Sequence, residues 1–350
     1  MIALVTGSSG FIGSHLVERL LDDGVGVRAL VRPGRSPAPR PGVEAHVVDW
    51  EDASARAIDA ALDGAGVVFH LAGVTKAHSA LHFRRGNVVP FAALAAGVRR
   101  LPPARRPRVV LVSSQAASGP ASGPDAPVTE ETAPAPVEGY GRSKLDAERE
   151  AHALAGEAPV TIVRPSCVYG PRDRDFFQLV RLAHRGWSVQ PGSRDRWLDL
   201  VHVHDLVDGL LAAARMPQAI GRTYFLGDRA LTWRALHELV AAAVGRPVRA
   251  VDLPDWLVRA GGAAGSAWST LTGRTPLLNA HKAALGRQAY WLCSCERARR
   301  ELGYAPSIAL PHGLRQTYLW YLEQAWLRPM SRDARDRRLR HDPDGRTAPR

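Results

Sequence analysis

Cysteine is scarce in this sequence, and long apolar runs are missing. The three cysteines in 350 residues, Cys167, Cys293 and Cys295, are too few for a disulfide framework, and Cys-Ser-Cys lacks nearby partners for zinc. We expect no metal and a reducing, cytoplasmic setting. No apolar run approaches the roughly 18 residues that a membrane helix needs, and the strand that begins after Met1 leaves no room for a cleaved leader. We therefore expect a soluble protein without a membrane partner.

Lysine is also scarce, so the positive charge is almost entirely arginine. The 46 Lys and Arg against 34 Asp and Glu give a formal net charge of +12, yet the lysines are only Lys76, Lys144 and Lys282. Such a charge suggests a nucleic-acid partner. The arginine bias in a chain rich in Ala, Gly and Pro instead suggests coding composition, and no nucleic-acid motif is present. Residues 328–350 predict a basic disordered tail, with a phosphate- or lipid-binding tail as the alternative.

Strand and helix patterns alternate over the first ~165 residues. Residues 2–6 form a short apolar run, and residues 11–22 place apolar side chains at helical spacing. Further strands begin at Val25, Ala45, Gly66, Arg108 and Val160, and long helical patterns cover 80–99 and 140–155. This alternation predicts an α/β fold with a doubly wound parallel sheet, a Rossmann domain at 1–170.

The regular alternation ends after Pro165. Residues 171–327 contain short strands and helical patches, which predict mainly a smaller C-terminal substrate lobe with strands that return to the main sheet. Residues 115–138 are rich in Pro, Gly, Ser and Ala, so we expect an exposed loop. Eight of the nine tryptophans follow residue 170, and we expect most of them in the core of the lobe.

A glycine-rich turn, TGSSGFIG at residues 6–13, joins the first strand to the first helix. Gly7 permits the tight turn, Gly10 lets the backbone approach a pyrophosphate, and Gly13 lets the helix pack closely. The helix N-terminus favours an anion through its free N–H groups and its dipole. This context predicts a dinucleotide site whose contacts are Gly7, Ser9, Gly10, Phe11 and Ile12.

Two residues bear on which dinucleotide binds. Arg32, with Arg35 close behind, stands where an acidic residue would bind the adenosine ribose. Because arginine suits a 2′-phosphate, we expect NADP(H), with NAD(H) as the alternative if Arg32 is only a solvated loop residue. Asp49 ends the third predicted strand, where its carboxylate can accept from the adenine amino group; a helix N-cap is the alternative.

Tyr140 and Lys144 begin a predicted helix, and their i, i+4 spacing puts both on one face. A nearby ammonium stabilises a phenolate, so we expect Lys144 to lower the pKa of Tyr140 toward the working pH. Ser114 ends the fifth predicted strand, at the carboxyl edge of the sheet where such folds bind ligands. The three residues predict a catalytic group.

The motifs TGSSGFIG, HLAG (70–73), VSS (112–114), YGRSK (140–144) and RPSCVYGP (164–171) together resemble the extended short-chain dehydrogenase/reductase family. The resemblance implies that Tyr140 is the general acid/base, that Lys144 binds the nicotinamide ribose, and that Ser114, rather than Ser113, bonds the reacting oxygen. It also implies that the cofactor is lined by Leu71, Ala72 and Gly73, that Asn87 lies at the active-site helix, and that homodimers form through the helices at 80–99 and 140–155.

The resemblance covers both sugar-modifying enzymes and reductases. The epimerases typically have an arginine where Leu198 precedes Asp199 in this chain, although Arg196 could substitute for it. Residues 166–168, Ser-Cys-Val, occupy a place where such enzymes carry an asparagine that contacts the nucleotide. Gln115 stands where a dehydratase needs an acid. We therefore expect a dehydrogenase or reductase that transfers hydride to or from the carbonyl or alcohol carbon of a small, rather apolar substrate. The alternatives are a nucleotide-sugar epimerase with tightly bound NAD and a non-catalytic dinucleotide-binding protein.

Overall fold

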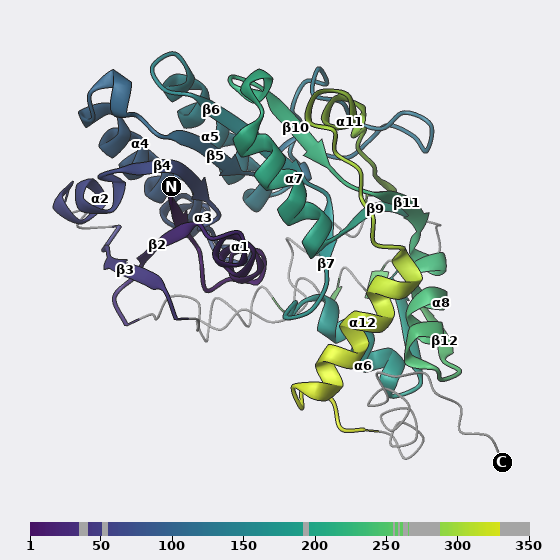
Figure 1. The fold of residues 1–350 in the computed structure, drawn as a ribbon. Helices are drawn as coiled ribbons and strands as arrows, with labels where there is room; N and C mark the ends of the chain where they lie inside the picture. The colour runs from purple at the N-terminus through teal and green to yellow at the C-terminus, as the bar shows by residue number, and fades with distance from the viewer. Residues whose placement is uncertain are drawn as a thin grey trace.

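A seven-stranded, entirely parallel sheet forms the centre of the protein (Figure 1). The computed structural model describes residues 1–34, 41–50, 55–191, 196–254, 256–257, 260–261, 265 and 288–329. The strands lie in the order β10-β6-β5-β4-β1-β2-β3, and every neighbouring pair is parallel. Their bounds are β1 Ile2–Thr6, β2 Gly26–Val31, β3 Val43–Val47, β4 Ala65–His70, β5 Arg108–Val112, β6 Val160–Pro165 and β10 Thr223–Leu226.

Helices cover both faces of this sheet. Apolar side chains of α1 (Phe11–Asp22) and α7 (Val203–Arg215) pack in one buried cluster with the sheet, and those of α2 (Ala55–Leu62), α4 (Val89–Arg100) and α5 (Gly139–Ala155) pack in another. Parallel strands need such crossover helices, which bury the sheet on both sides. The predicted doubly wound Rossmann fold is confirmed.

Two expectations about segments of this domain are wrong. The helical stretch at 80–99 is two helices, α3 (Ala80–Asn87) and α4, because Pro90 cannot continue a helix but suits the first turn of a new one. The loop at 115–138 is partly buried, because Ala121 N and Val128 N donate to backbone oxygens at Tyr290 and Leu292. A distant segment therefore covers this loop.

The second half of the chain adds a smaller set of strands and helices. Figure 1 shows α6, α8 and α12 gathered on one side, away from β2 and β3. Strand β9 (Trp197–His202) pairs with β7 (Cys167–Tyr169), β11 (Arg229–Thr232) and β13 (Tyr290–Trp291), and β8 (Trp187–Pro191) pairs with β12 (Arg249–Leu253). The helices are α6 Phe176–His184, α8 Trp233–Val244, α11 Glu296–Leu302 and α12 Leu310–Glu323, with short 3₁₀ turns at Pro103–Arg105, Gln115–Ala117 and Pro217–Ala219.

Most of the described tryptophans pack in this second half, as expected. Trp326 stacks on Tyr321 at 5.5 Å between ring centroids and meets Trp320 edge-on, whereas Trp187 and Trp256 are exposed. Trp268 and the predicted tail from Met330 onward lie outside the described residues. Within the described ranges, none of the helices combines the length and the apolar character that crossing a membrane requires.

Candidate active site

The turn between β1 and α1 depends on its glycines. Gly7 has φ +72°, and a Cβ added there would lie 2.8 Å from Ala72 N. A Cβ on Gly13 would lie 2.1 Å from Gly7 O, so only glycine lets α1 approach the turn this closely. Gly10 is the N-cap of α1 and supplies no side chain to satisfy the helix N–H groups. This glycine cradle fits a pyrophosphate.

The ends of β1 and β4 are held together beside this turn. Thr6 Oγ1 bonds His70 Nδ1 and accepts from Ala72 N, both at 3.0 Å. The segment at 71–73 therefore runs past the glycine turn, at the point where the strand order reverses and such sheets bind their ligands. Three of the predicted cofactor contacts here are exposed, namely Ser9, Gly10 and Gly73. The other five are partly buried: Gly7, Phe11, Ile12, Leu71 and Ala72.

Arg32 and Asp49 follow the ends of two adjacent strands, β2 and β3. Val48 N donates to Val31 O at 2.8 Å, so the residues that follow β2 and β3 emerge side by side at the carboxyl edge. Both side chains are exposed, and Asp49 lies two residues beyond β3 rather than at its end. Arg35 lies outside the described residues.

Tyr140, Ser114 and Lys144 come together at the same edge of the sheet. Tyr140 lies in the first turn of α5, and the Ser114 side chain is near enough to its phenol to lower the pKa of that phenol. Ser114 follows β5 and caps the Gln115–Ala117 turn by accepting from Ala116 N at 3.2 Å. Lys144, one turn further along α5, is buried, and its ammonium donates to Val112 O at 2.7 Å.

The pKa of Tyr140 moves opposite to the sequence-based expectation. Burial raises it to about 12, the hydrogen bond with Ser114 lowers it less, and the charge of Glu138 raises it further. Burial also lowers the pKa of Lys144 to about 8, which the negative charge of Glu148 partly offsets. A raised pKa favours the protonated phenol at neutral pH, and the Lys144 ammonium is directed at the end of β5.

The neighbouring serine, Ser113, serves a different part of the structure. Its hydroxyl donates to Glu148 Oε1 at 2.5 Å, and Glu148 forms a bidentate ion pair with Arg164 of β6, with Arg164 Nη2 to Glu148 Oε2 at 2.6 Å. All three residues are buried. This contact supports Ser114, rather than Ser113, as the serine available to a substrate.

Residues 3–227 match the NAD-dependent epimerase/dehydratase family. The chain belongs to that family. The resemblance to the extended short-chain dehydrogenase/reductases is thereby confirmed, and with it an enzyme family whose members use a nicotinamide cofactor.

The relatives of this family member include reductases. The chain is 31% identical over 331 residues to a ceramide reductase of Caulobacter vibrioides, which covers 93% of this chain and 96% of the relative. It is also 30% identical over 330 residues to a 4-hydroxy-2-methyl-3-oxo-4-farnesyl-3,4-dihydroquinoline-1-oxide ketoreductase of Stigmatella aurantiaca. That match covers 90% of this chain and 95% of the relative. The solved structure of MoeE5 in complex with UDP-glucose and NAD superimposes with a TM-score of 0.74 at 25% sequence identity. The superposition covers 93% of this chain and 100% of the MoeE5 chain.

Leu198 and Asp199, which bear on the branch of the family, have structural roles here. Leu198 is 7% exposed, and Asp199 accepts from Cys293 N at 2.6 Å, so both belong to the packing around β9. Asn87 joins the chain after β4 to the active-site helix: its amide bonds both backbone groups of Val74 and donates to Ser143 Oγ at 2.8 Å.

Two residues of the site were missed by sequence reasoning. Thr6 joins β1 to β4, and a hydroxyl at the end of an apolar strand beside a glycine turn was the available signal. Glu138 caps α5 immediately before Tyr140; glutamate is not a favoured N-cap, so the sequence carried no comparable signal.

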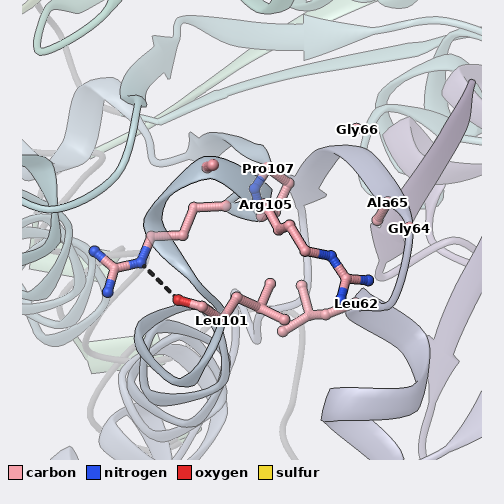
Figure 2. A pocket seen from close by; sticks show the side chains of 9 residues that line it. Leu62, Gly64, Ala65, Gly66, Leu101, Arg105 and Pro107 are labelled. Atoms are coloured by element: carbon pink, nitrogen blue, oxygen red, sulfur yellow. Dashed lines mark hydrogen bonds between the residues drawn. The ribbon is translucent and has the colours of Figure 1, made fainter.

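A cavity of about 270 Å³ lies at the opposite edge of the sheet, at the starts of β4 and β5 (Figure 2). Its arginines are already engaged: Arg106 Nε donates to Leu101 O at 3.2 Å, the dashed line in Figure 2, and Arg105 pairs with Asp63 at 2.5 Å. Parallel sheets bind ligands at their carboxyl edge, so this cavity is not the candidate active site.

Proposed function

We propose that the protein is an NADP(H)-dependent reductase or dehydrogenase that acts on a carbonyl or alcohol carbon of a small, rather apolar substrate. The observation that carries this proposal is that the first turn of α5, which holds Tyr140, packs on the turn that Ser114 caps, with Lys144 one helical turn away. A phenol and a hydroxyl at the carboxyl edge can both bond one substrate oxygen.

The reaction divides between the cofactor and the chain's own residues. Bound nicotinamide supplies or accepts the hydride. Tyr140 donates its proton to the substrate oxygen during reduction and accepts it during oxidation, and Ser114 orients that oxygen by a hydrogen bond. Lys144, held by Val112 O, keeps a positive charge near the phenol and would bind the ribose of the cofactor. The glycine cradle and the N-terminus of α1 hold the pyrophosphate.

The named relatives support this branch of the family. Both the ceramide reductase and the farnesyl-dihydroquinoline-oxide ketoreductase are reductases whose names describe molecules with long apolar chains. The place where epimerases typically carry an arginine is taken by Leu198, which is 7% exposed in β9, and Arg196 lies two residues earlier. The substrate search should therefore begin with apolar ketones and alcohols.

Replacement of the tyrosine tests the proposed chemistry. Tyr140→Phe removes the proton donor and keeps the ring, so we expect turnover of an accepted ketone to fall at least about 100-fold while the Kd for the cofactor changes little. Ser114→Ala should reduce turnover less. Full activity of Tyr140→Phe would refute the catalytic role, and absence of turnover in the wild type with a broad panel of ketones and alcohols would favour a non-catalytic dinucleotide-binding protein.

The preference for NADP(H) rests on Arg32. Its exposed guanidinium at the end of β2 suits a 2′-phosphate, and no acidic residue takes that position. We expect Arg32→Ala to weaken NADPH binding by about tenfold and to leave NADH binding nearly unchanged. Arg149→Ala is the control, because it removes the same charge from a side chain that is 70% exposed on α5. Equal Kd values for NADPH and NADH in the wild type would refute the preference.

A nucleotide-sugar epimerase is the second candidate, favoured by the likeness to the solved structure that holds UDP-glucose and NAD. Such an enzyme retains its cofactor through each cycle. Protein purified without added cofactor should be denatured and the released dinucleotide identified by mass spectrometry. Near-stoichiometric NAD would support the epimerase and count against the role of Arg32, whereas an empty protein that binds NADPH reversibly would support the reductase.

A further inference from the structure

The buried carboxylate of Glu138 lies at the start of the active-site helix. Glu138 is 3% exposed, and both of its oxygens accept backbone N–H groups of α5, Oε2 from Tyr140 and Oε1 from Gly141, each at 2.5 Å. Within the described ranges, no arginine or lysine forms an ion pair with it. The two N–H groups and the helix dipole offset the cost of burying the charge. A neutral Ser or Asn would cap the helix without that cost, so capping alone does not explain a carboxylate here.

The cap also determines where Tyr140 stands relative to Ser114. A Cβ on Gly141 would lie 2.2 Å from Ala116 O, so the first turn of α5 packs directly on the Gln115–Ala117 turn. That turn is itself capped by Ser114. Glu138 therefore fixes the helix start that carries the phenol against the turn that carries the serine.

Besides fixing the position of the phenol, Glu138 affects its ionisation through its negative charge. A negative charge two residues from Tyr140 disfavours the phenolate and so raises the pKa of the phenol. The other groups near the two residues are the neutral Ser114, the ring of Phe83 from α3, His70 of β4, which burial keeps neutral, and Glu148, which pairs with Arg164. The His82, Arg84 and Arg85 side chains of α3 are exposed.

We propose that Glu138 is a positioning residue that holds Tyr140 at Ser114 and keeps the phenol in its protonated form, which biases the enzyme toward reduction. This inference rests on the proposed function, because the protonated phenol is the proton donor of the reductive direction. Proton abstraction during oxidation needs the phenolate, which the same charge opposes.

A matched pair of variants separates the charge from the cap. Glu138→Asp and Glu138→Asn both offer a capping oxygen on a side chain of the same size, but only the aspartate is charged. Ionisation of Tyr140 can be followed by phenolate absorbance after a stopped-flow pH jump, as the difference from the same protein with Tyr140→Phe. We expect the midpoint in Glu138→Asn to lie roughly 0.5–1 pH unit below that in Glu138→Asp. Equal midpoints would overturn the electrostatic role, whether or not a substrate is known.

Kinetics then test the bias toward reduction. With an accepted ketone and alcohol pair, Glu138→Asn should raise the ratio of oxidative to reductive kcat at neutral pH about threefold or more over Glu138→Asp. An unchanged ratio would overturn the bias even where the midpoints differ. If the shortened side chains prevent folding, Glu138→Gln compared with the wild type gives the same two readouts. Lack of turnover in the wild type would refute the proposed function and the bias, while the absorbance midpoints would still decide the electrostatic role.

Discussion

Removal of one partner from the ion pair of Arg164 and Glu148 should destabilise the protein severely. Arg164 is 4% exposed and Glu148 1%, and two hydrogen bonds join them, Nε to Oε1 at 2.9 Å and Nη2 to Oε2 at 2.6 Å. The Arg164 guanidinium also lies over the Phe225 ring, 5.5 Å from its centroid. Arg164→Met would leave the carboxylate buried, with Ser113 Oγ as its one hydrogen-bond partner among the described residues and with the Lys144 ammonium as a nearby charge.

The expected cost follows from this burial. Breaking a buried pair by removing one ion typically costs about 3–5 kcal/mol, because an uncompensated charge remains. Replacing both ions with apolar residues, as in Arg164→Met with Glu148→Leu, should recover most of the loss. Since Glu148 also acts on Lys144, this double variant should fold but turn over more slowly than the wild type.

Urea unfolding with unchanged m-value provides the measurement. The control is Asp146→Asn, which breaks the ion pair of Asp146 with Arg149 on the outer face of α5, where the side chains are 44% and 70% exposed; we expect a change below about 0.5 kcal/mol. A loss below about 1 kcal/mol in Arg164→Met would show that the pair is not desolvated as its burial indicates.

Two further predictions concern the glycine turn and the buried histidines. Gly13→Ala places a Cβ 2.1 Å from a backbone oxygen, so we expect the free energy of unfolding to fall by at least about 2 kcal/mol and calorimetry to show loss of most of the dinucleotide affinity. The control is Gly156→Ala, whose Cβ has nothing within 4 Å and which should bind the dinucleotide normally. Equal affinities of the two variants would refute the steric argument. Burial lowers the pKa of His15 to about 4 and of His70 and His202 to about 3. The unfolded chain therefore binds more protons below pH ~6.5, and unfolding free energy should fall as pH drops from 7 to 5, by up to about 1.4 kcal/mol per pH unit for each histidine; a flat profile in urea titrations would contradict this.

The features that could be predicted from the sequence are those encoded by a few consecutive residues. Short apolar runs in alternation with helical patterns predicted the strands and helices of the main sheet. Strands buried on both faces of a sheet need near-continuous apolar residues, which are visible in the sequence. The glycine turn and the i, i+4 spacing of Tyr140 and Lys144 are likewise contained in a few consecutive residues. Pro90 was a local signal too, and it marks where the predicted helix at 80–99 divides.

The remaining features depend on residues that are far apart in the chain. The segment at 115–138 reads as an exposed loop because its burial comes from hydrogen bonds to residues 290–292, which no local pattern reports. The pKa of Tyr140 moved opposite to expectation because burial, together with the charge of Glu138, outweighs the lowering effect of Ser114. Spacing alone shows which groups can meet, but not how much water surrounds them.

The sequence by itself determined the family, the fold class and the residue types at the site, because all three follow from short motifs and from periodic burial. The resemblance had already chosen Ser114 over Ser113, and only the tertiary structure showed what Ser113 does instead: its hydroxyl donates to the buried ion pair of Glu148 and Arg164, which distant segments bring together. The tertiary structure also decided that a buried carboxylate stands beside the phenol, because burial and charge at one point are set by packing between distant segments.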